Sequence, residues 1–527
     1  MRTTTPTIEP SAKPRSLQIG RQPNQRWIQL AAPTVIVLVV GLFSTAAADA
    51  AQLRAGVAKV DITNTEAGPV NDPLYAKALV LKDDATTAVI VTVDAVAIGE
   101  IGHIKNDYLS KVRSQLEQEL NIKATNVLIG ASHCHGAVCA DVAERTVQAV
   151  RQAWQNMVPV RLGAGVGHED RIMENRRLKL NSGREADVRH AYSLPPDEAV
   201  AAVGPVDPEI GILRLDRQDG RTLAVVYNFA CHPIQGVPSG GTTADLAGFA
   251  SAAIEDCLGE GAIALFLQGC AGDINPVLYK DVANPRDAEP LGNMLGLSTI
   301  KALKRIQSRE DGRLKVLHEI IELPRADLAG RISSMQAEQA RLVQSLKGTS
   351  LNLKTFIPLA VRYSLSSEFP SYYSHRYLHE EMTGRDHLKR LDAENRRNME
   401  QYVRNIHVME ELTRLQVNLN LLEKHQAANA AAEKRTIDVE VLGVRIGDFV
   451  LLSFPGELTV QIGLNIKKAS PHKLTFIAGC SNGYIYYAPT AEQLKNVGGA
   501  QEDSDCLLAP EWQKLHEEKA AEMLKKL

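Results

Sequence analysis

Two histidines at the end of a predicted strand are the first residues whose types and spacing suggest chemistry. The apolar run 127–129 is followed by the letters GASHCHG, which contain His133 and His135. In extended backbone, residues i and i+2 project from the same face, so both imidazoles can point into one pocket. Imidazole is the commonest metal ligand and the usual acid–base group near neutral pH. The pair by itself also fits ordinary polar or core histidines.

Three later segments add matching groups. His232 follows the apolar strand pattern 223–229, Glu457 comes directly after a strand and a Pro-Gly turn, and segment 481–490 holds three tyrosines within four positions. Two histidines and a carboxylate, with one position left for water, are a typical catalytic zinc set. An acid in the first turn of a helix and a tyrosine-rich core element are the structural alternatives. Because the groups are scattered along the chain, spacing alone does not establish a site.

Strand and helix patterns alternate on both sides of these groups. The sequence predicts strands at 78–81, 88–94, 126–130, 223–229 and 262–267, and helices at 103–120, 141–156 and 246–257. Alternation of this kind is typical of α/β proteins with a largely buried sheet. We therefore predict the α/β class, with a layered mixed β-sheet catalytic domain over 51–527 and a long α-helical insertion.

The predicted insertion spans about 325–435. Leu328, Ile332, Met335, Leu342 and Leu346 follow one helical face, although Gln339 interrupts it, and a second apolar face runs from Tyr402 to Leu422. Both patterns predict amphipathic helices that form an antiparallel pair against the main domain. A partner-binding coiled coil is the alternative. The segment 369–373 between them is predicted to be a loop, which we place over the active site.

The net charge and the N-terminal sequence indicate which partners and which cellular compartment to expect. A net charge of −3 and dispersed Lys and Arg residues give no reason to expect a nucleic-acid partner. Residues 1–50 combine a basic lead-in, an apolar run from Leu30 to Phe43 and small residues at 46–50. This pattern predicts an export signal, and hence a secreted, periplasmic or cell-surface protein. An uncleaved membrane anchor, with association at a membrane surface, is the alternative.

The seven cysteines are too few and too scattered for a disulfide scaffold. Cys134, Cys231, Cys270 and Cys480 fall in or beside the segments that carry the histidines and tyrosines. They are interpreted as small apolar residues packed around a site. Thiolate ligation of zinc is the second interpretation.

The motifs together resemble those of the neutral/alkaline non-lysosomal ceramidases, over about 54–320 and again over 437–490. The resemblance is carried, in the same order along the chain, by an AGxxxxDIT strand at 55–63, a strand followed by His133-Cys134-His135-Gly136, His232-Pro233, Pro455-Gly456-Glu457, and an N-x-Y-x-x-Y segment at 482–487. It identifies the chain as a divergent member related to the catalytic domain of that family.

The resemblance implies a zinc-dependent amidohydrolase acting on a small-molecule or lipid N-acyl substrate, as in sphingolipid metabolism. It implies that Zn²⁺ is held by His133, His232, Glu457 and Tyr487. It further implies that His135 carries a proton beside the metal and that Arg176 steadies the scissile carbonyl, for which a permanent planar charge is well suited.

Several departures from the family pattern leave other functions open. Asn275 stands where the family has a serine proposed as nucleophile, so attack has to come from water activated by the metal. The C-terminal sandwich domain of long members is missing, and the predicted helical insertion replaces shorter family sequence. A catalytically inactive lipid- or glycan-binding relative and a metallo-esterase are the two alternatives.

Overall fold

The structure is a computed structural model, and it describes residues 52–188, 194–195, 197–277, 279, 281, 283–371, 373–496 and 499–527. The predicted signal peptide or anchor at 1–50 lies outside these residues. Within the described ranges, none of the helices combines the length and the apolar character that crossing a bilayer would need.

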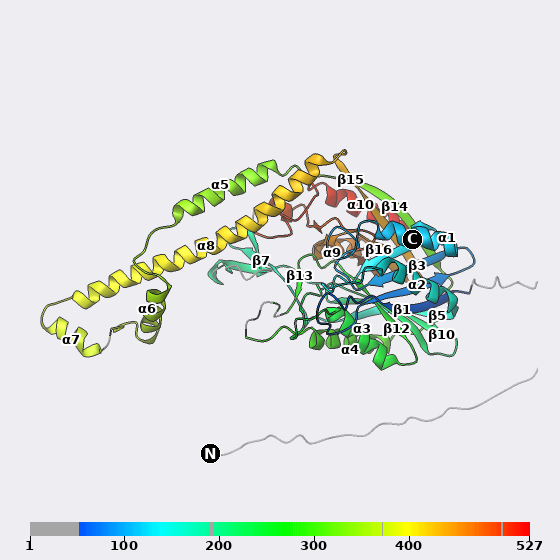
Figure 1. Cartoon of the computed structure of the whole chain (residues 1–527), viewed down its shortest axis with the longest axis horizontal. Helices are drawn as coiled ribbons and strands as arrows, with labels where there is room; N and C mark the ends of the chain where they lie inside the picture. Colours follow the sequence, from blue (N-terminus) through cyan, green and yellow to red (C-terminus); the bar gives the residue numbers. More distant parts are fainter. Residues whose placement is uncertain are drawn as a thin grey trace, which may run out of the picture. The chain divides into compact units, whose positions relative to one another are not determined.

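The largest sheet of the described residues is mixed, and it lies at the right of Figure 1. Among the described residues, eight strands pair in the spatial order β12 (Ile263–Gln268), β11 (Thr222–Phe229), β10 (Glu209–Arg217), β5 (Val158–His168), β1 (Arg54–Asp61), β2 (Tyr75–Lys82), β3 (Thr87–Val93) and β4 (Val127–Ala131). The pairs β3–β4 and β11–β12 are parallel and the others are antiparallel. The predicted α/β class with a mixed sheet is therefore confirmed.

Both faces of this sheet are buried, which explains why its strands are almost continuously apolar. Along β2, Ala78 and Val80 point to one core while Leu79 and Leu81 point to another. This alternation follows from the two-residue repeat of extended backbone. The first core lies under the helices α1 (Tyr108–Leu120) and α2 (Val142–Gln155).

A second sheet packs against the other face of the first. It contains β14 (Leu314–Pro324), β15 (Thr436–Ile446), β16 (Phe449–Ser453) and β18 (Thr475–Ala478). The core between the two sheets includes Leu213, Leu265, Phe449 and Phe476. The helices α3 (Asp245–Leu258) and α4 (Glu289–Leu303) cover the β10–β12 end of the first sheet, and α9 (Val460–Ala469) and α10 (Trp512–Lys526) cover the second. The layers are thus helix, sheet, sheet, helix.

Short strands beyond the main sheets bring loops together near the ends of β4 and β11. These are the pairs β6 (Met173–Asn175) with β13 (Ile274–Pro276) and β17 (Glu457–Leu458) with β19 (Tyr487–Ala488), and the group β7 (Arg177–Leu180), β8 (Glu185–Asp187) and β9 (Val200–Val203). In the β17–β19 pair, Glu457 lies opposite Tyr487.

Four helices, α5 (Ala329–Ser345), α6 (Leu353–Leu365), α7 (Ser374–Met382) and α8 (His387–Ala431), connect β14 to β15. The helices α5 and α8 run antiparallel, because Leu328 N–H donates to Gln426 and Gln339 bonds to Gln416 across the pair. Gln339, which interrupts the predicted apolar face, therefore has a polar partner on the opposite helix. Figure 1 shows that α8 continues well past the end of α5, with α6 and α7 beside its first half.

Two details differ from the sequence-based expectations. The helix predicted at 103–120 begins at Tyr108, because the Asn106 side chain bonds to the backbone and carboxylate of Glu100 and holds the preceding residues in a loop. The loop at 369–373 was predicted to lie over the active site. It joins α6 to α7, where Phe369 packs on Tyr377, and none of its described residues lines the cavity described below.

One buried histidine in α10 makes the stability of this protein sensitive to acid. His516 packs against Phe454 and Trp512, and neither of its ring nitrogens has a hydrogen-bond partner. Burial lowers the pKa of His516 to about 4, whereas a histidine in the unfolded chain titrates near about 6.5. Between these values only the unfolded chain takes up the proton, so stability falls as the pH falls through that window.

We expect this histidine to cost about 2 kcal/mol of unfolding free energy on going from pH 8 to pH 5. In His516→Leu that part of the pH dependence should disappear, as measured by urea unfolding at the two pH values. The matched control is His168→Leu, because the His168 side chain is 65% exposed. An equal pH dependence in His516→Leu and the wild type would contradict the prediction.

Candidate metal centre

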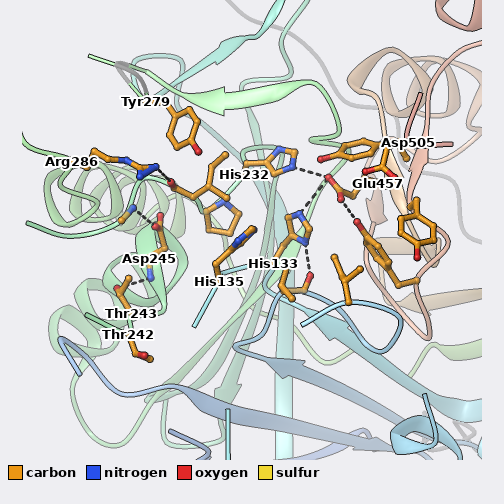
Figure 2. A pocket seen from close by; sticks show the side chains of 18 of the residues that line it. His133, His135, His232, Thr242, Thr243, Asp245, Tyr279, Arg286, Glu457 and Asp505 are labelled. Carbon is orange, nitrogen blue, oxygen red and sulfur yellow. Dashed lines mark hydrogen bonds and ion pairs between the residues drawn. The ribbon is translucent and has the colours of Figure 1, made fainter. Parts of the chain in front are cut away.

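Three side chains from distant parts of the chain converge at one end of the sheets (Figure 2). His133 follows β4, His232 follows β11 and Glu457 begins β17. One ligand atom from each of the three lies within 4.8 Å of the other two, and all three residues are buried. The structure thus brings together three of the four metal ligands that the family resemblance implies.

Backbone carbonyls fix the protonation of the two imidazoles. His133 Nδ1 lies 2.5 Å from the carbonyl oxygen of Val96, and His232 Nδ1 lies 2.9 Å from that of Ile274. A carbonyl oxygen only accepts, so each Nδ1 carries the hydrogen and donates it. Nε2 is then the nitrogen whose lone pair is available when either ring is neutral, the arrangement found in most metal-bound histidines.

Both Nε2 atoms face the same carboxylate oxygen. Glu457 Oε2 lies 2.8 Å from Nε2 of His232 and 3.4 Å from Nε2 of His133. With Nδ1 already protonated, the neutral ring of His232 presents an Nε2 lone pair to an oxygen that also carries lone pairs. Such a set of acceptors is stable only with a positive charge between them.

The pKa values of the three groups show the same need for positive charge. Burial lowers the pKa of His133, but the neighbouring Cys480 and Glu457 outweigh it and leave that pKa well above the ordinary value. Burial lowers the pKa of His232 to about 4, so this ring stays neutral near pH 7. Burial raises the pKa of Glu457, but the histidines outweigh it and hold that pKa well below its usual range. A proton on His133 therefore balances the charge of Glu457 but leaves the lone pair of His232 Nε2 facing the carboxylate.

The loops around the three ligands contain several non-glycine residues with left-handed backbone. His133 has φ of 73°, Cys480 of 48°, Asn482 of 59° and Tyr486 of 64°. Such conformations cost energy and persist only where the surrounding structure enforces them, which is common at functional sites. Asn482 helps to enforce them, since its side chain accepts a hydrogen bond from Ile129 N–H in β4 at 2.8 Å.

Two tyrosines approach the carboxylate. The hydroxyl of Tyr484 donates to Oε1 of Glu457, the oxygen that does not face the histidines. Burial, and to a smaller extent the negative charge of Glu457, raises the pKa of Tyr484 well above its ordinary value. Tyr487, the tyrosine that the resemblance implies as a ligand, also lines the cavity and lies opposite Glu457 in the β17–β19 pair. Its assignment as a ligand stays a prediction.

Arg176 lies behind Tyr487. The guanidinium sits 5.5 Å from the ring centroid of Tyr487, is 0% exposed and bonds to Glu502 and Asn275. Burial lowers the pKa of Arg176, but the charges of Glu502 and Tyr487 raise it above its ordinary value. Arg176 is not among the residues that line the cavity, so its contact with a scissile carbonyl also stays a prediction.

A cavity of about 510 Å³ gives access to the three ligands. His135 lies on its wall, with its ring 6.0 Å from that of His133, and it is exposed to solvent. Figure 2 shows Asp245, Thr243 and Arg286 on one side of the histidines and Asp505 on the other. Its role as a proton carrier stays a prediction.

Part of the wall comes from residues that sequence reasoning missed. Lys424, from α8, lines the cavity and donates to the hydroxyl of Tyr486 at 3.2 Å. The adjacent His425 is buried and bonds to Asp505 at 2.6 Å, and Asp505 also lines the cavity. No motif marks these residues, because only the folding of α8 against the C-terminal segment brings them to the site.

The cysteines do not contribute to the set of three ligands. All seven lie in the described ranges and are free. Cys134, Cys231 and Cys270 are buried in apolar cores, and Cys480 places its sulfur 3.6 Å from Nδ1 of His133 rather than on the Nε2 side. Their packing fits the interpretation as small residues around the site.

Substitution of the two tyrosines separates their roles. Tyr484→Phe removes the hydrogen bond that orients Glu457, and we expect about a 10- to 100-fold loss of zinc affinity, the usual effect of removing such support. Tyr487→Phe should cost more if Tyr487 is itself a ligand. Competition with a chromophoric chelator measures both affinities. Unchanged affinity in Tyr487→Phe would contradict its assignment as a ligand.

No protein-family model matches the chain, and no curated protein matches its sequence significantly. Solved structures that resemble it include the following two. The neutral ceramidase from Pseudomonas aeruginosa has a TM-score of 0.58 and 16% identity, over 91% of this chain and 75% of that one. A ceramidase complexed with C2 also has a TM-score of 0.58, with 17% identity, over 90% of this chain and 76% of that one. The resemblance predicted from the motifs is therefore confirmed at the level of the fold.

Proposed function

We propose that this protein is a divergent relative of the neutral ceramidases and an exported, zinc-dependent hydrolase that cleaves an amide bond of an N-acyl substrate. The observation that carries the proposal is the convergence of two imidazole Nε2 atoms on one carboxylate oxygen at 2.8 and 3.4 Å, with each Nδ1 bonded to a carbonyl. A divalent cation satisfies all three acceptors at once, whereas a single proton does not. The fold shared with ceramidases supports the choice of an amide substrate.

The residues present fit zinc. His133, His232 and Glu457 would hold it, and Tyr487 would supply a phenolic oxygen as the fourth ligand. Nitrogen and carboxylate ligands with one position open to water are typical of catalytic zinc. When bound, zinc polarises a carbonyl oxygen and lowers the pKa of water to near about 7.

The remaining steps belong to side chains of the chain. His135 accepts a proton from the attacking water and returns it to the departing amine, a role that its exposed position on the cavity wall permits. Tyr484 keeps Glu457 oriented through its hydroxyl. In this proposal Arg176 supports the developing negative charge, and its guanidinium lies 5.5 Å from the ring of Tyr487 on the cavity wall.

The buried residue Asn275 supports attack by water. It lies in β13 and accepts a hydrogen bond from Arg176 at 3.1 Å. An amide side chain has no nucleophilic oxygen that could form an acyl intermediate. In this proposal its amide oxygen positions Arg176.

Metal analysis combined with activity measurements tests the proposal. We expect the purified protein to contain about one zinc per chain and to hydrolyse at least one member of a panel of N-acyl sphingoid bases, N-acyl amino acids and N-acyl amino sugars. Removal of zinc by a chelator should abolish hydrolysis, and added zinc should restore it. A folded protein without metal would contradict the proposal. Zinc without turnover would support an inactive binding relative, and turnover of esters alone a metallo-esterase.

Export is tested separately. Mass spectrometry of the protein recovered outside the cytoplasm should find a mature chain that begins near residue 49 or 51. An intact N-terminus in the membrane fraction would support the uncleaved anchor, and recovery from the cytoplasm would contradict export.

A further inference from the structure

Helix α6 has an exposed apolar face. Leu353, Ile357, Val361 and Leu365 recur every four residues, and their exposed fractions lie between 50% and 81%. On the neighbouring helix α7, Leu378 and Met382 are 51% and 86% exposed. A run of large apolar side chains along one helix differs from singly scattered apolar residues, which need no explanation.

The exposed face is distinct from the face that holds α6 in place. Phe356 stacks on Tyr402 of α8 with ring centroids 4.6 Å apart, and the Tyr363 hydroxyl donates to Asp392 of α8 at 2.9 Å. The other oxygen of Asp392 accepts from Tyr377 of α7 at 2.6 Å. One carboxylate on α8 thus holds both short helices beside it (Figure 1). We call the four exposed residues Leu353, Ile357, Val361 and Leu365 the stripe. On a helical repeat of 3.6 residues, the stripe falls roughly opposite Phe356 and Tyr363, which contact α8.

The segment that carries this apolar face has a net positive charge. Residues 347–390, from the end of α5 to the first turn of α8, contain seven Lys and Arg and four Asp and Glu, a net charge of +3. The whole chain carries −3, so the remaining residues carry −6. Lys354 falls within the arc of the stripe and Arg362 borders it. A long basic side chain beside apolar residues can bury its stem and keep its charge at a polar interface.

We infer that the α6 face docks onto a lipid surface that contains anionic headgroups. An apolar face flanked by Lys and Arg is the feature by which helices lie in the interfacial plane of a bilayer. The positive charge of 347–390 adds attraction to anionic lipids. The contact lies in α6, outside the residues that line the cavity, and it does not depend on the metal centre.

A second copy of the chain fits this face less well. A symmetric dimer brings the same patch of both copies together, and here each copy would contribute a segment of net charge +3. Like charges brought face to face oppose association. Anionic lipid is complementary to the same segment.

Insertion of α6 itself is measured with a fluorescent label, so that any membrane affinity of residues 1–50 does not affect the result. Val361→Cys carries an environment-sensitive fluorophore on a Cys257→Ser background, which removes the exposed cysteine. The signal of the labelled background protein is subtracted. We expect a blue shift with vesicles of phosphatidylcholine and phosphatidylglycerol, and quenching by lipid-borne quenchers. A label at Leu297→Cys in α4, where Leu297 is 57% exposed, should give neither.

Two sets of variants test which residues are responsible. Ile357→Gln combined with Leu365→Gln should weaken vesicle binding at least 10-fold, whereas Leu297→Gln combined with Ile320→Gln, also at exposed apolar positions, should not. Lys354→Glu combined with Arg362→Glu should remove the preference for anionic over pure phosphatidylcholine vesicles. Circular dichroism confirms that each variant is folded.

The results that would overturn the inference are specific. One is the absence of a blue shift at residue 361 on anionic vesicles. Another is concentration-dependent dimerisation in sedimentation experiments that Ile357→Gln combined with Leu365→Gln abolishes, since that would assign the face to a second copy. His232→Ala should bind vesicles like the wild type, which separates this inference from the proposed metal chemistry.

Discussion

The variant His232→Ala is expected to lose both bound zinc and hydrolysis. His232 supplies the ligand atom closest to Glu457, at 2.8 Å, and its position is held by the carbonyl of Ile274. Loss of the metal removes several kcal/mol of transition-state stabilisation, which is about 1,000-fold or more in rate. Elemental analysis and turnover of the best substrate in the panel measure the two effects on one preparation.

Two further variants make this result specific. His168→Ala removes an exposed histidine and should retain full zinc and activity. Glu457→Gln keeps the size of the side chain but removes its charge, and we expect weaker zinc binding with the fold intact. A His232→Ala protein with wild-type zinc content would show that the ion is held elsewhere.

The second large effect is on stability. Arg176 and Glu502 are both fully buried, and Arg177, which is 2% exposed, bonds to Glu502 at 3.0 Å and to Asp503 at 2.8 Å. Removing the charge of Glu502 leaves Arg176 without its carboxylate partner and Arg177 with one fewer. Breaking a buried ion pair on one side typically costs about 3–5 kcal/mol, so we expect a loss of that size in the urea unfolding free energy of Glu502→Gln.

An exposed ion pair provides the control for this loss. Glu119 pairs with Arg151 at the surface, with side chains 33% and 42% exposed, and Glu119→Gln should change stability little, because solvent screens an exposed ion pair. In the double variant Arg176→Met with Glu502→Leu, both charges of this ion pair are removed. Because Arg176 is then not left as an unpaired buried charge, the double variant should recover part of the stability that Glu502→Gln loses. Equal small losses in Glu502→Gln and Glu119→Gln would show that the buried network is not needed for folding.

Loss of the Glu502 charge should also lower zinc affinity at the candidate metal centre. Arg176 contacts Glu502 on one side and the ring of Tyr487 on the other. If Arg176 moves when its carboxylate is removed, Tyr487 loses its neighbouring positive charge. Zinc affinity in Glu502→Gln, measured on the folded fraction, should therefore fall together with stability.

The layered fold followed from local patterns in the sequence. The continuous apolar runs of β2, β3 and β11 predicted buried strands, and the structure buries both their faces between helices and a second sheet. The antiparallel helices α5 and α8 followed from a repeat of three and four residues. These patterns are short-range, so they can be recognised without knowing which elements meet.

The sequence by itself determined the types of the chemical groups: histidines at strand ends, a glutamate after a Pro-Gly turn and a cluster of tyrosines. It did not determine that both Nε2 atoms face one oxygen of Glu457, that Tyr484 donates to the other oxygen, or that Arg176 pairs with Glu502. It also gave no sign that Lys424, in the helical segment, would reach the cavity. These contacts join residues up to several hundred positions apart, and their geometry depends on sheet pairing and layer packing, which no local pattern encodes.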